Sequence, residues 1–101
     1  MTTAEQIARW NANGSPHIPD HIADALVMYI DHGAKPGSFT TACIDNDALG
    51  ASHHAGAGIT LDTIKGVTGF LYNYAPQNCW GSREKRLVWQ QQARSRMAEA
   101  V

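Results

Sequence analysis

The sequence predicts an all-α domain, a compact bundle of four main helices with a shorter helix at the N-terminus. Apolar residues recur at helical spacing in several segments, and no segment shows the alternation of a strand. Gly-Ser pairs at Gly37-Ser38 and Gly81-Ser82 follow clusters of Gly, Pro or Asn. Such a serine caps a helix, because its hydroxyl accepts a hydrogen bond from a first-turn N–H. The 101 residues, 44% of them hydrophobic, are enough for one core and too few for two.

The N-terminal third is predicted to contain two helices. Residues 1–16 form an N-terminal arm with a short helix over 3–12. The second helix is predicted over 19–32, where Pro19 suits the first turn because its missing N–H has no partner there. Its apolar stripe contains Ile22, Leu26, Tyr29 and Ile30. Gly33 is expected to end this helix.

The middle of the chain is predicted to contain one helix and one loop. Ser38 is the expected cap of a third helix over 39–49. Its buried side is expected to contain Phe39, Ala42, Cys43 and Leu49. Residues 50–58 are rich in Gly, Ala and His and are predicted to form a flexible loop.

A fourth helix is predicted over 61–74, with Thr60 as its cap. Two glycines, Gly66 and Gly69, lie inside this helix, where glycine permits the close approach of another helix or a ligand. The predicted apolar stripe contains Leu61, Ile64, Val67, Leu71 and Tyr74.

The last helix is predicted over 83–98 with Ser82 as its cap. Its first half is expected to be anchored by Leu87, Val88 and Trp89. Residues 90–101 are strongly polar, and this end of the helix is expected to fray.

Charge is distributed unevenly along the chain. The net charge of −1 argues against a general nucleic-acid binder. Residues 83–101 nevertheless hold five basic and two acidic residues, a net of +3, and the preceding part has a net of −4. This asymmetry can serve internal docking, self-association or contact with an anionic partner.

The two cysteines, Cys43 and Cys79, have apolar or aromatic neighbours and no metal-binding spacing. We expect free, buried thiols and no disulfide. The first residues lack the basic and apolar regions of a signal peptide, and no apolar run approaches the ~20 residues that cross a membrane. These features predict a cytoplasmic protein with no membrane contact.

Several short motifs occur in a distinctive order between residues 18 and 90. They are Pro36-Gly37-Ser38-Phe39, Ala42, Asn46-Asp47, Leu71-Tyr72-Asn73, Ala75-Pro76, and Trp80-Gly81-Ser82 followed by Trp89. With this order and spacing the chain resembles a group of small uncharacterised proteins of phage and prophage genomes. The resemblance implies a compact helical accessory protein made inside an infected bacterium, and it implies no activity. In the group that it resembles, the region around residues 51–58 is a helical continuation, whereas this chain is rich in His and Gly there and departs from that pattern.

A phosphate group is one candidate ligand. The segment after the second predicted helix offers a lysine, hydroxyl groups and the N–H groups of a helix start: Lys35, Gly37, Ser38, Thr40 and Thr41. The segment lacks the Walker A pattern. The alternative interpretation is that Ser38 only caps its helix while Lys35 is solvated.

The second candidate site is the aromatic turn together with the start of the last helix. Its residues are Tyr72, Tyr74, Trp80, Arg83 and Arg86. Aromatic rings beside arginines anchor protein interfaces or stack on nucleobases. The alternative is that Tyr74 and Trp80 close the core across the turn.

No combination of residues has the spacing that catalysis or metal binding requires, so we expect no catalytic residue, metal or cofactor. The five histidines, His17, His21, His32, His53 and His54, are scattered. We therefore expect a non-enzymatic protein that binds a host or phage protein, with self-association into a homo-oligomer as a further expectation. The alternatives are a phosphorylated small molecule such as a nucleotide, held at residues 35–41, and nucleic-acid contact through the basic last helix.

Overall fold

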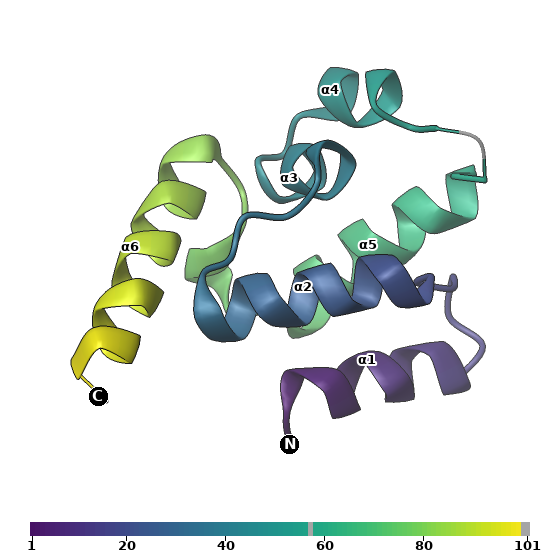
Figure 1. The fold of residues 1–101 in the computed structure, drawn as a ribbon. Helices are drawn as coiled ribbons and strands as arrows, with labels where there is room; N and C mark the ends of the chain where they lie inside the picture. Colours follow the sequence, from purple (N-terminus) through teal and green to yellow (C-terminus); the bar gives the residue numbers. More distant parts are fainter. Residues whose placement is uncertain (57, 100–101) are drawn as a thin grey trace.

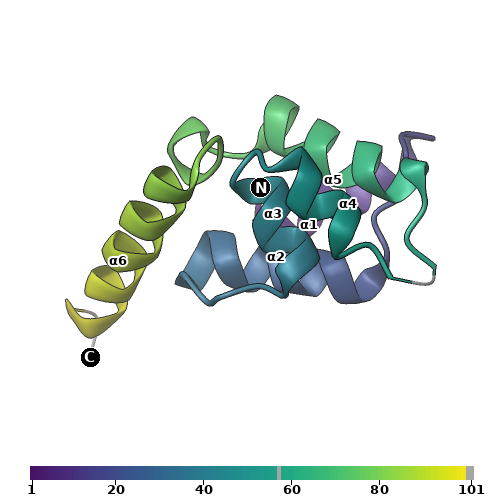
Figure 2. The same cartoon turned by 90° about the horizontal axis from the view of Figure 1, so that it is seen from above.

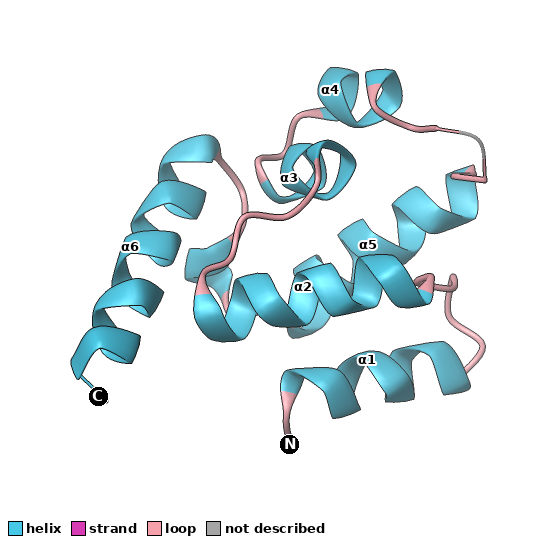
Figure 3. Ribbon diagram, viewed as in Figure 1, coloured by secondary structure: helices cyan, strands magenta, loops and turns pink. Residues whose placement is uncertain are grey.

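Six α-helices and one short 3₁₀ turn follow one another along the chain. The structure is a computed structural model that describes residues 1–56 and 58–99. The helices are α1 (Thr3–Ala12), α2 (Asp20–His32), α3 (Ser38–Ile44), α4 (Ala48–His53), α5 (Leu61–Tyr74) and α6 (Arg83–Glu99), with the turn η1 (Gln77–Cys79) before α6. Within the described residues 71% of the chain is helical and there is no strand, which confirms the predicted all-α fold class (Figure 3).

Helices α1, α2 and α5 pack around a common core, and α3 with α4 lies across one side of them (Figure 1). Helix α6 stands at one end of the molecule, where it contacts α2 and the η1 turn (Figure 2). The largest fully buried side chains come from α2, α3, α5 and the connecting segments: Ile18, Leu26, Tyr29, Ile44, Val67, Phe70 and Cys79. Their burial supplies the main driving force for the fold.

The N-terminal helices begin and end close to the predicted positions. The Thr2 hydroxyl accepts a hydrogen bond from the N–H of Glu5 and so caps α1. Pro19 occupies the position before α2, and Gly33 ends that helix with φ 71°, as predicted. Only glycine adopts this left-handed conformation without strain, and the Gly33 N–H returns to the Tyr29 carbonyl at 2.9 Å.

The predicted third helix over 39–49 is wrong, because the chain forms two short helices there. Asn46 has φ 59° and ends α3. The side chain of Asp47 then accepts a hydrogen bond from the Gly50 N–H at 2.9 Å and starts α4. Aspartate and asparagine side chains bond nearby backbone N–H groups, so the run from Asp45 to Asp47 favours a break. As a result Leu49 is 85% exposed and does not join the core.

The predicted loop over 50–58 is wrong for its first part. Residues 50–53 belong to α4. From residue 54 to residue 60 the described positions are non-helical, and residue 57 lies outside the described part. The flexibility of this segment stays a prediction.

The two Gly-Ser pairs differ in what their serines do. Gly37 occupies the N-cap position of α3, and Ser38 is the first helical residue and makes no capping bond, so the prediction for Ser38 is wrong. The Ser82 hydroxyl accepts a hydrogen bond from the Lys85 N–H at 3.1 Å and caps α6 as predicted. An N-cap residue comes directly before the first helical residue. Helix α3 already begins at Ser38, so Gly37 takes the N-cap position.

This difference gives a matched test. We expect Ser82→Ala to lower the free energy of unfolding by about 1 kcal/mol, because the Lys85 N–H loses its partner. Ser38→Ala is the control and is expected to change the free energy of unfolding by less than about 0.5 kcal/mol. Urea unfolding followed by circular dichroism measures both. An equal loss in the two variants would contradict the assignment of the caps.

Helix α5 matches its predicted range and its predicted cap. Thr60 and Thr63 form a reciprocal capping box. Gly66 lies against the N-terminal arm, where a methyl group would come within 2.7 Å of the Pro16 carbonyl oxygen and within 2.9 Å of that of His17. The glycine therefore permits the close approach that its position suggested. The buried stripe is shorter than predicted, since its central residues are buried and its outermost ones, Leu61 and Tyr74, are exposed.

Helix α6 docks through Trp89 as predicted, but the prediction is wrong for Leu87 and Val88. Its buried or half-buried residues are Arg86, Trp89, Gln90 and Ala93, whereas Leu87 and Val88 are exposed. The indole N–H of Trp89 donates to the Ile30 carbonyl, and the Gln90 amide donates to the Gly33 carbonyl, both at 3.2 Å. The helix is continuous to Glu99, and residues 100–101 lie outside the described part. The fraying of this end stays a prediction.

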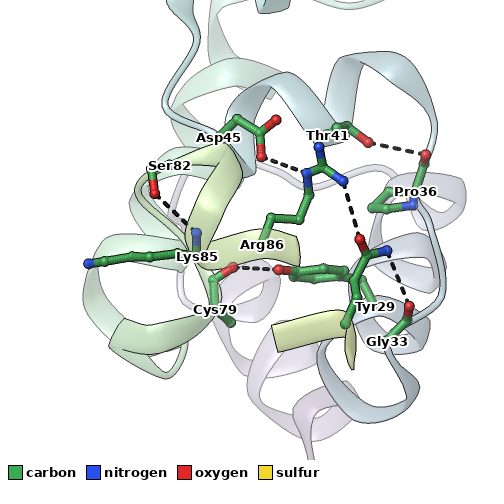
Figure 4. A network of polar contacts seen from close by, with 10 residues as sticks. Tyr29, Gly33, Pro36, Thr41, Asp45, Cys79, Ser82, Lys85 and Arg86 are labelled. Carbon is green, nitrogen blue, oxygen red and sulfur yellow. Dashed lines mark hydrogen bonds and ion pairs between the residues drawn. The ribbon is translucent and has the colours of Figure 1, made fainter. Parts of the chain in front are cut away.

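A polar network fastens α6 to the rest of the molecule (Figure 4). Arg86 Nε lies 2.7 Å from Asp45 Oδ1, and its guanidinium also donates to Gln90. The side chains of Arg86 and Asp45 are only 9% and 15% exposed. Below this pair the Tyr29 hydroxyl donates to the Cys79 carbonyl at 2.6 Å, and burial raises the pKa of that hydroxyl.

None of the described helices combines the length and apolar character needed to span a bilayer.

Candidate functional site

A groove runs along α5 on the side that faces α3 and α4. Its first part is a cavity of about 360 Å³ lined by Cys43, Asn46, Thr68, Gly69, Leu71, Tyr72, Asn73 and Trp80. A second cavity of about 250 Å³ shares Cys43, Asn46 and Thr68 with the first. It continues toward Ala48, Ala51 and Ile64. We call the two cavities together the α5 groove.

Local sequence features shape both walls of the groove. On α5, Ile64, Thr68 and Tyr72 are four residues apart and therefore line one side of the helix. The Thr68 hydroxyl donates to the Ile64 carbonyl at 2.7 Å, which uses its hydrogen within the helix. On the opposite wall the left-handed backbone of Asn46 turns the chain from α3 into α4. The groove therefore depends on the same break that divides the predicted third helix.

One end of the groove is aromatic. The rings of Tyr72 and Trp80 are 5.9 Å apart between centroids, and Tyr72 is 74% exposed. Trp80 is half-buried, and its backbone is fixed because the N–H of Gly81 donates to the Ile44 carbonyl at 2.8 Å.

The indole nitrogen of Trp80 is the unusual atom at this end. It is fully buried, and it is the one buried side-chain nitrogen or oxygen of the described residues without a hydrogen-bond partner. A buried donor that lacks an acceptor costs about 1–3 kcal/mol. A native structure that keeps such a donor calls for an explanation, and a bound acceptor is one.

The groove contains a thiol but no activated nucleophile. Burial raises the pKa of Cys43, which lines both cavities, to about 11, and it raises the pKa of Cys79 to about 12. Both cysteines are free and buried, as predicted. At neutral pH both side chains are therefore thiols, whereas the thiolate is the reactive form. Among the described residues no three His, Cys, Asp or Glu side chains converge as they would around a metal ion.

The structure divides the predicted aromatic and arginine site among three places. Tyr72 and Trp80 lie together in the α5 groove. Tyr74 packs instead against Trp10, with ring centroids 5.8 Å apart. Arg83 is exposed on α6, whereas Arg86 is buried in its pair with Asp45. Arg86 is therefore a structural residue, and the five predicted residues do not form one surface.

The predicted phosphate residues come together only in part. A cavity of about 340 Å³ is lined by Lys35, Gly37, Ser38 and Thr41, and also by Asp45, Asp47, His54 and Arg86. Thr40 is buried. The Thr41 hydroxyl donates to the Pro36 carbonyl at 3.2 Å. Arg86 pairs with Asp45, which leaves Lys35 and Asp47 as opposite charges, and this nearly neutral lining does not favour the phosphate hypothesis.

The groove itself was missed by the sequence analysis, although one signal pointed to it. Asn46, Leu71-Tyr72-Asn73 and Trp80 belong to the motifs that carry the resemblance to phage proteins, and all of them line the larger cavity. The helix-by-helix interpretation treated these residues separately. Their common location shows that they form one place in the fold.

No family model, curated protein or solved structure matches this chain. The resemblance to phage and prophage proteins therefore stays a prediction, and the function is argued from the geometry of the site.

Proposed function

We propose that this chain is a non-enzymatic binding protein that recognises a partner protein through the α5 groove. The observation that carries the proposal is the buried indole N–H of Trp80, which has no partner and belongs to a side chain lining an open cavity. Because this nitrogen is closed to solvent, the Trp80 ring must turn toward the cavity before a carbonyl group of a bound segment can supply the missing acceptor. Tyr72 at the rim is well exposed, and tyrosine and tryptophan are the side chains that most often dominate binding energy at interfaces.

The rest of the groove favours an apolar segment. The second cavity is lined mainly by small or apolar side chains, among them Ala48, Ala51 and Ile64. Leu49 on α4 and Leu61 on α5 are exposed, but neither lines the cavity. The occupant is therefore a short apolar segment that offers one hydrogen-bond acceptor to Trp80.

The cellular setting of the proposal comes from the resemblance. The protein acts as a phage-type accessory protein in the bacterial cytosol, and its partner is a host or phage protein. Phosphorylated small molecules and nucleic acid are the weaker alternatives. The predicted phosphate cavity has a nearly neutral lining, and the predicted nucleic-acid site loses Arg86 to the pair with Asp45.

The test is selection from a random peptide library displayed on ribosomes, followed by affinity measurements with labelled synthetic peptides. Selected peptides should lose about 2 kcal/mol of binding free energy, roughly thirtyfold in affinity, when Tyr72 is replaced by alanine. The matched control is Tyr74→Ala, an exposed tyrosine two positions later that lies outside the groove. The control should leave the affinity unchanged.

A second measurement follows the Trp80 donor directly. Binding should shift the NMR signal of the Trp80 indole N–H downfield as it gains an acceptor, and Trp80→Phe identifies that signal among the three indoles. The absence of selected peptides, or peptides that bind Tyr72→Ala as well as the natural chain, would contradict the proposal. Self-association that Tyr72→Ala abolishes would identify a second copy, in place of a different protein, as the occupant.

A further inference from the structure

A separate cavity lies where α1 meets the end of α5. It has a volume of about 270 Å³ and shares no residue with the α5 groove. Its aromatic wall consists of Trp10 and Tyr74, whose rings meet edge to face at 5.8 Å and 77°. Its polar side chains include Arg9, Gln6 and Asn13. It therefore combines an aromatic surface, a cation and two amides.

The Trp10 ring is held firmly in place. Its indole N–H donates to the Pro16 carbonyl at 2.7 Å, and the ring meets Phe70 edge to face at 6.2 Å. Behind it lies Gly69, where a methyl group would come within 3.0 Å of the ring. A ring fixed on several sides loses little conformational entropy when a ligand binds against it.

The charge of this cavity is positive. Arg9 lines it, and no aspartate or glutamate does. Within the described residues Arg9 forms no ion pair. The nearest acidic residue along α1 is Glu5, one turn earlier, and its carboxylate accepts a hydrogen bond from the Thr2 hydroxyl at 3.0 Å. The contrast with the Lys35 cavity, which contains two aspartates, is clear.

From these observations we infer that the cavity binds a small aromatic carboxylate. The ring of the ligand lies against Trp10 and Tyr74, and its carboxylate pairs with the Arg9 guanidinium, whose planar geometry suits that group. The volume is below the range of about 300–1,000 Å³ for drug-sized ligands, so one or two fused rings fit better than a nucleotide. This inference does not depend on the proposed function of the α5 groove.

The test uses indole-3-acetate as the probe and neutral indole as its matched control, with binding followed by NMR. We expect indole-3-acetate to shift the signals of Trp10 and Tyr74 in a saturable manner and to bind about threefold more tightly than indole, because Arg9 is exposed and an exposed ion pair contributes only a small gain. Arg9→Gln should remove the difference between the two compounds. Arg83→Gln, which replaces an exposed arginine elsewhere, should retain it.

Three results would overturn the inference. One is equal affinity of the natural chain for indole and indole-3-acetate, and another is no saturable shift at about 10 mM ligand, a concentration that detects even millimolar binding. The third is tighter binding of adenosine monophosphate than of indole-3-acetate, which would contradict the size argument. Tyr72→Ala should bind indole-3-acetate normally, so this experiment and the test of the α5 groove can fail separately.

Discussion

Replacing Asp45 with alanine is expected to lower the free energy of unfolding by about 3 kcal/mol, because the change leaves the Arg86 charge buried without its partner. An arginine guanidinium is not deprotonated in proteins, so the buried charge would persist. Water cannot fully replace the carboxylate, since the Arg86 side chain is only 9% exposed. Chemical denaturation followed by circular dichroism measures the loss.

Asp24→Ala provides the matched control for this prediction. Asp24 is an exposed aspartate on α2, and its replacement should change the free energy of unfolding by no more than about 0.5 kcal/mol. The double replacement of Asp45 by leucine and Arg86 by methionine removes both charges, and it should cost less than Asp45→Ala alone. If Asp45→Ala and Asp24→Ala had the same small effect, the buried ion pair would not contribute to stability.

Gly33→Ala is the second large effect that we expect, a loss of about 3 kcal/mol. Two causes add at this position. The backbone has φ 71°, and a side chain in this left-handed conformation costs about 1–2 kcal/mol. The new methyl group would also come within 2.9 Å of both the Ala93 Cβ atom and the Gln90 carbonyl oxygen. Overpacking of this kind costs about 1–3 kcal/mol and would push α6 away from α2.

The chain provides a control that separates the two causes. Gly14 has φ 77° and no atom within 4 Å of the place a methyl group would take. Gly14→Ala should therefore show only the conformational cost, about 1–2 kcal/mol. The difference between the two variants measures the close approach of α6. Equal losses would mean that α6 does not pack against Gly33 in the manner described.

Helix boundaries could be predicted where a local chemical signal determines them. Thr60 and Ser82 cap their helices because each hydroxyl lies directly before the first turn, and Gly33 ends α2 because the chain needs a left-handed residue there. These signals depend on neighbours a few residues away. They therefore appear in the sequence without knowledge of the fold.

Other features depend on residues that are far apart in the chain. Arg86 looked like a free cation on the last helix, but Asp45, 41 positions earlier, makes it a structural residue. Leu87 and Val88 looked like anchors because they are apolar, whereas the carbonyls of Ile30 and Gly33 select the polar face of α6 instead. The hydrophobic pattern of a helix gives no information about hydrogen-bond acceptors that lie far away in the sequence.

The candidate site was predictable only in its aromatic residues. Tyr72 and Trp80 were identified from the turn that they flank, and the structure places them side by side. The groove beyond them needs the break at Asn46 and the unpartnered nitrogen of Trp80. The break has a local cause in the run from Asp45 to Asp47, which the helix prediction overlooked, whereas the missing partner of the Trp80 nitrogen depends on segments that are far apart in the chain.

The way in which α6 is attached has a thermodynamic consequence. Detaching this helix exposes mainly the polar groups of Arg86 and Gln90, one methyl group of Ala93 and part of the Trp89 indole. Exposed polar surface lowers the heat capacity and exposed apolar surface raises it, so the two contributions oppose each other here. The enthalpy of detaching α6 is therefore expected to change less with temperature than the enthalpy of melting the central core.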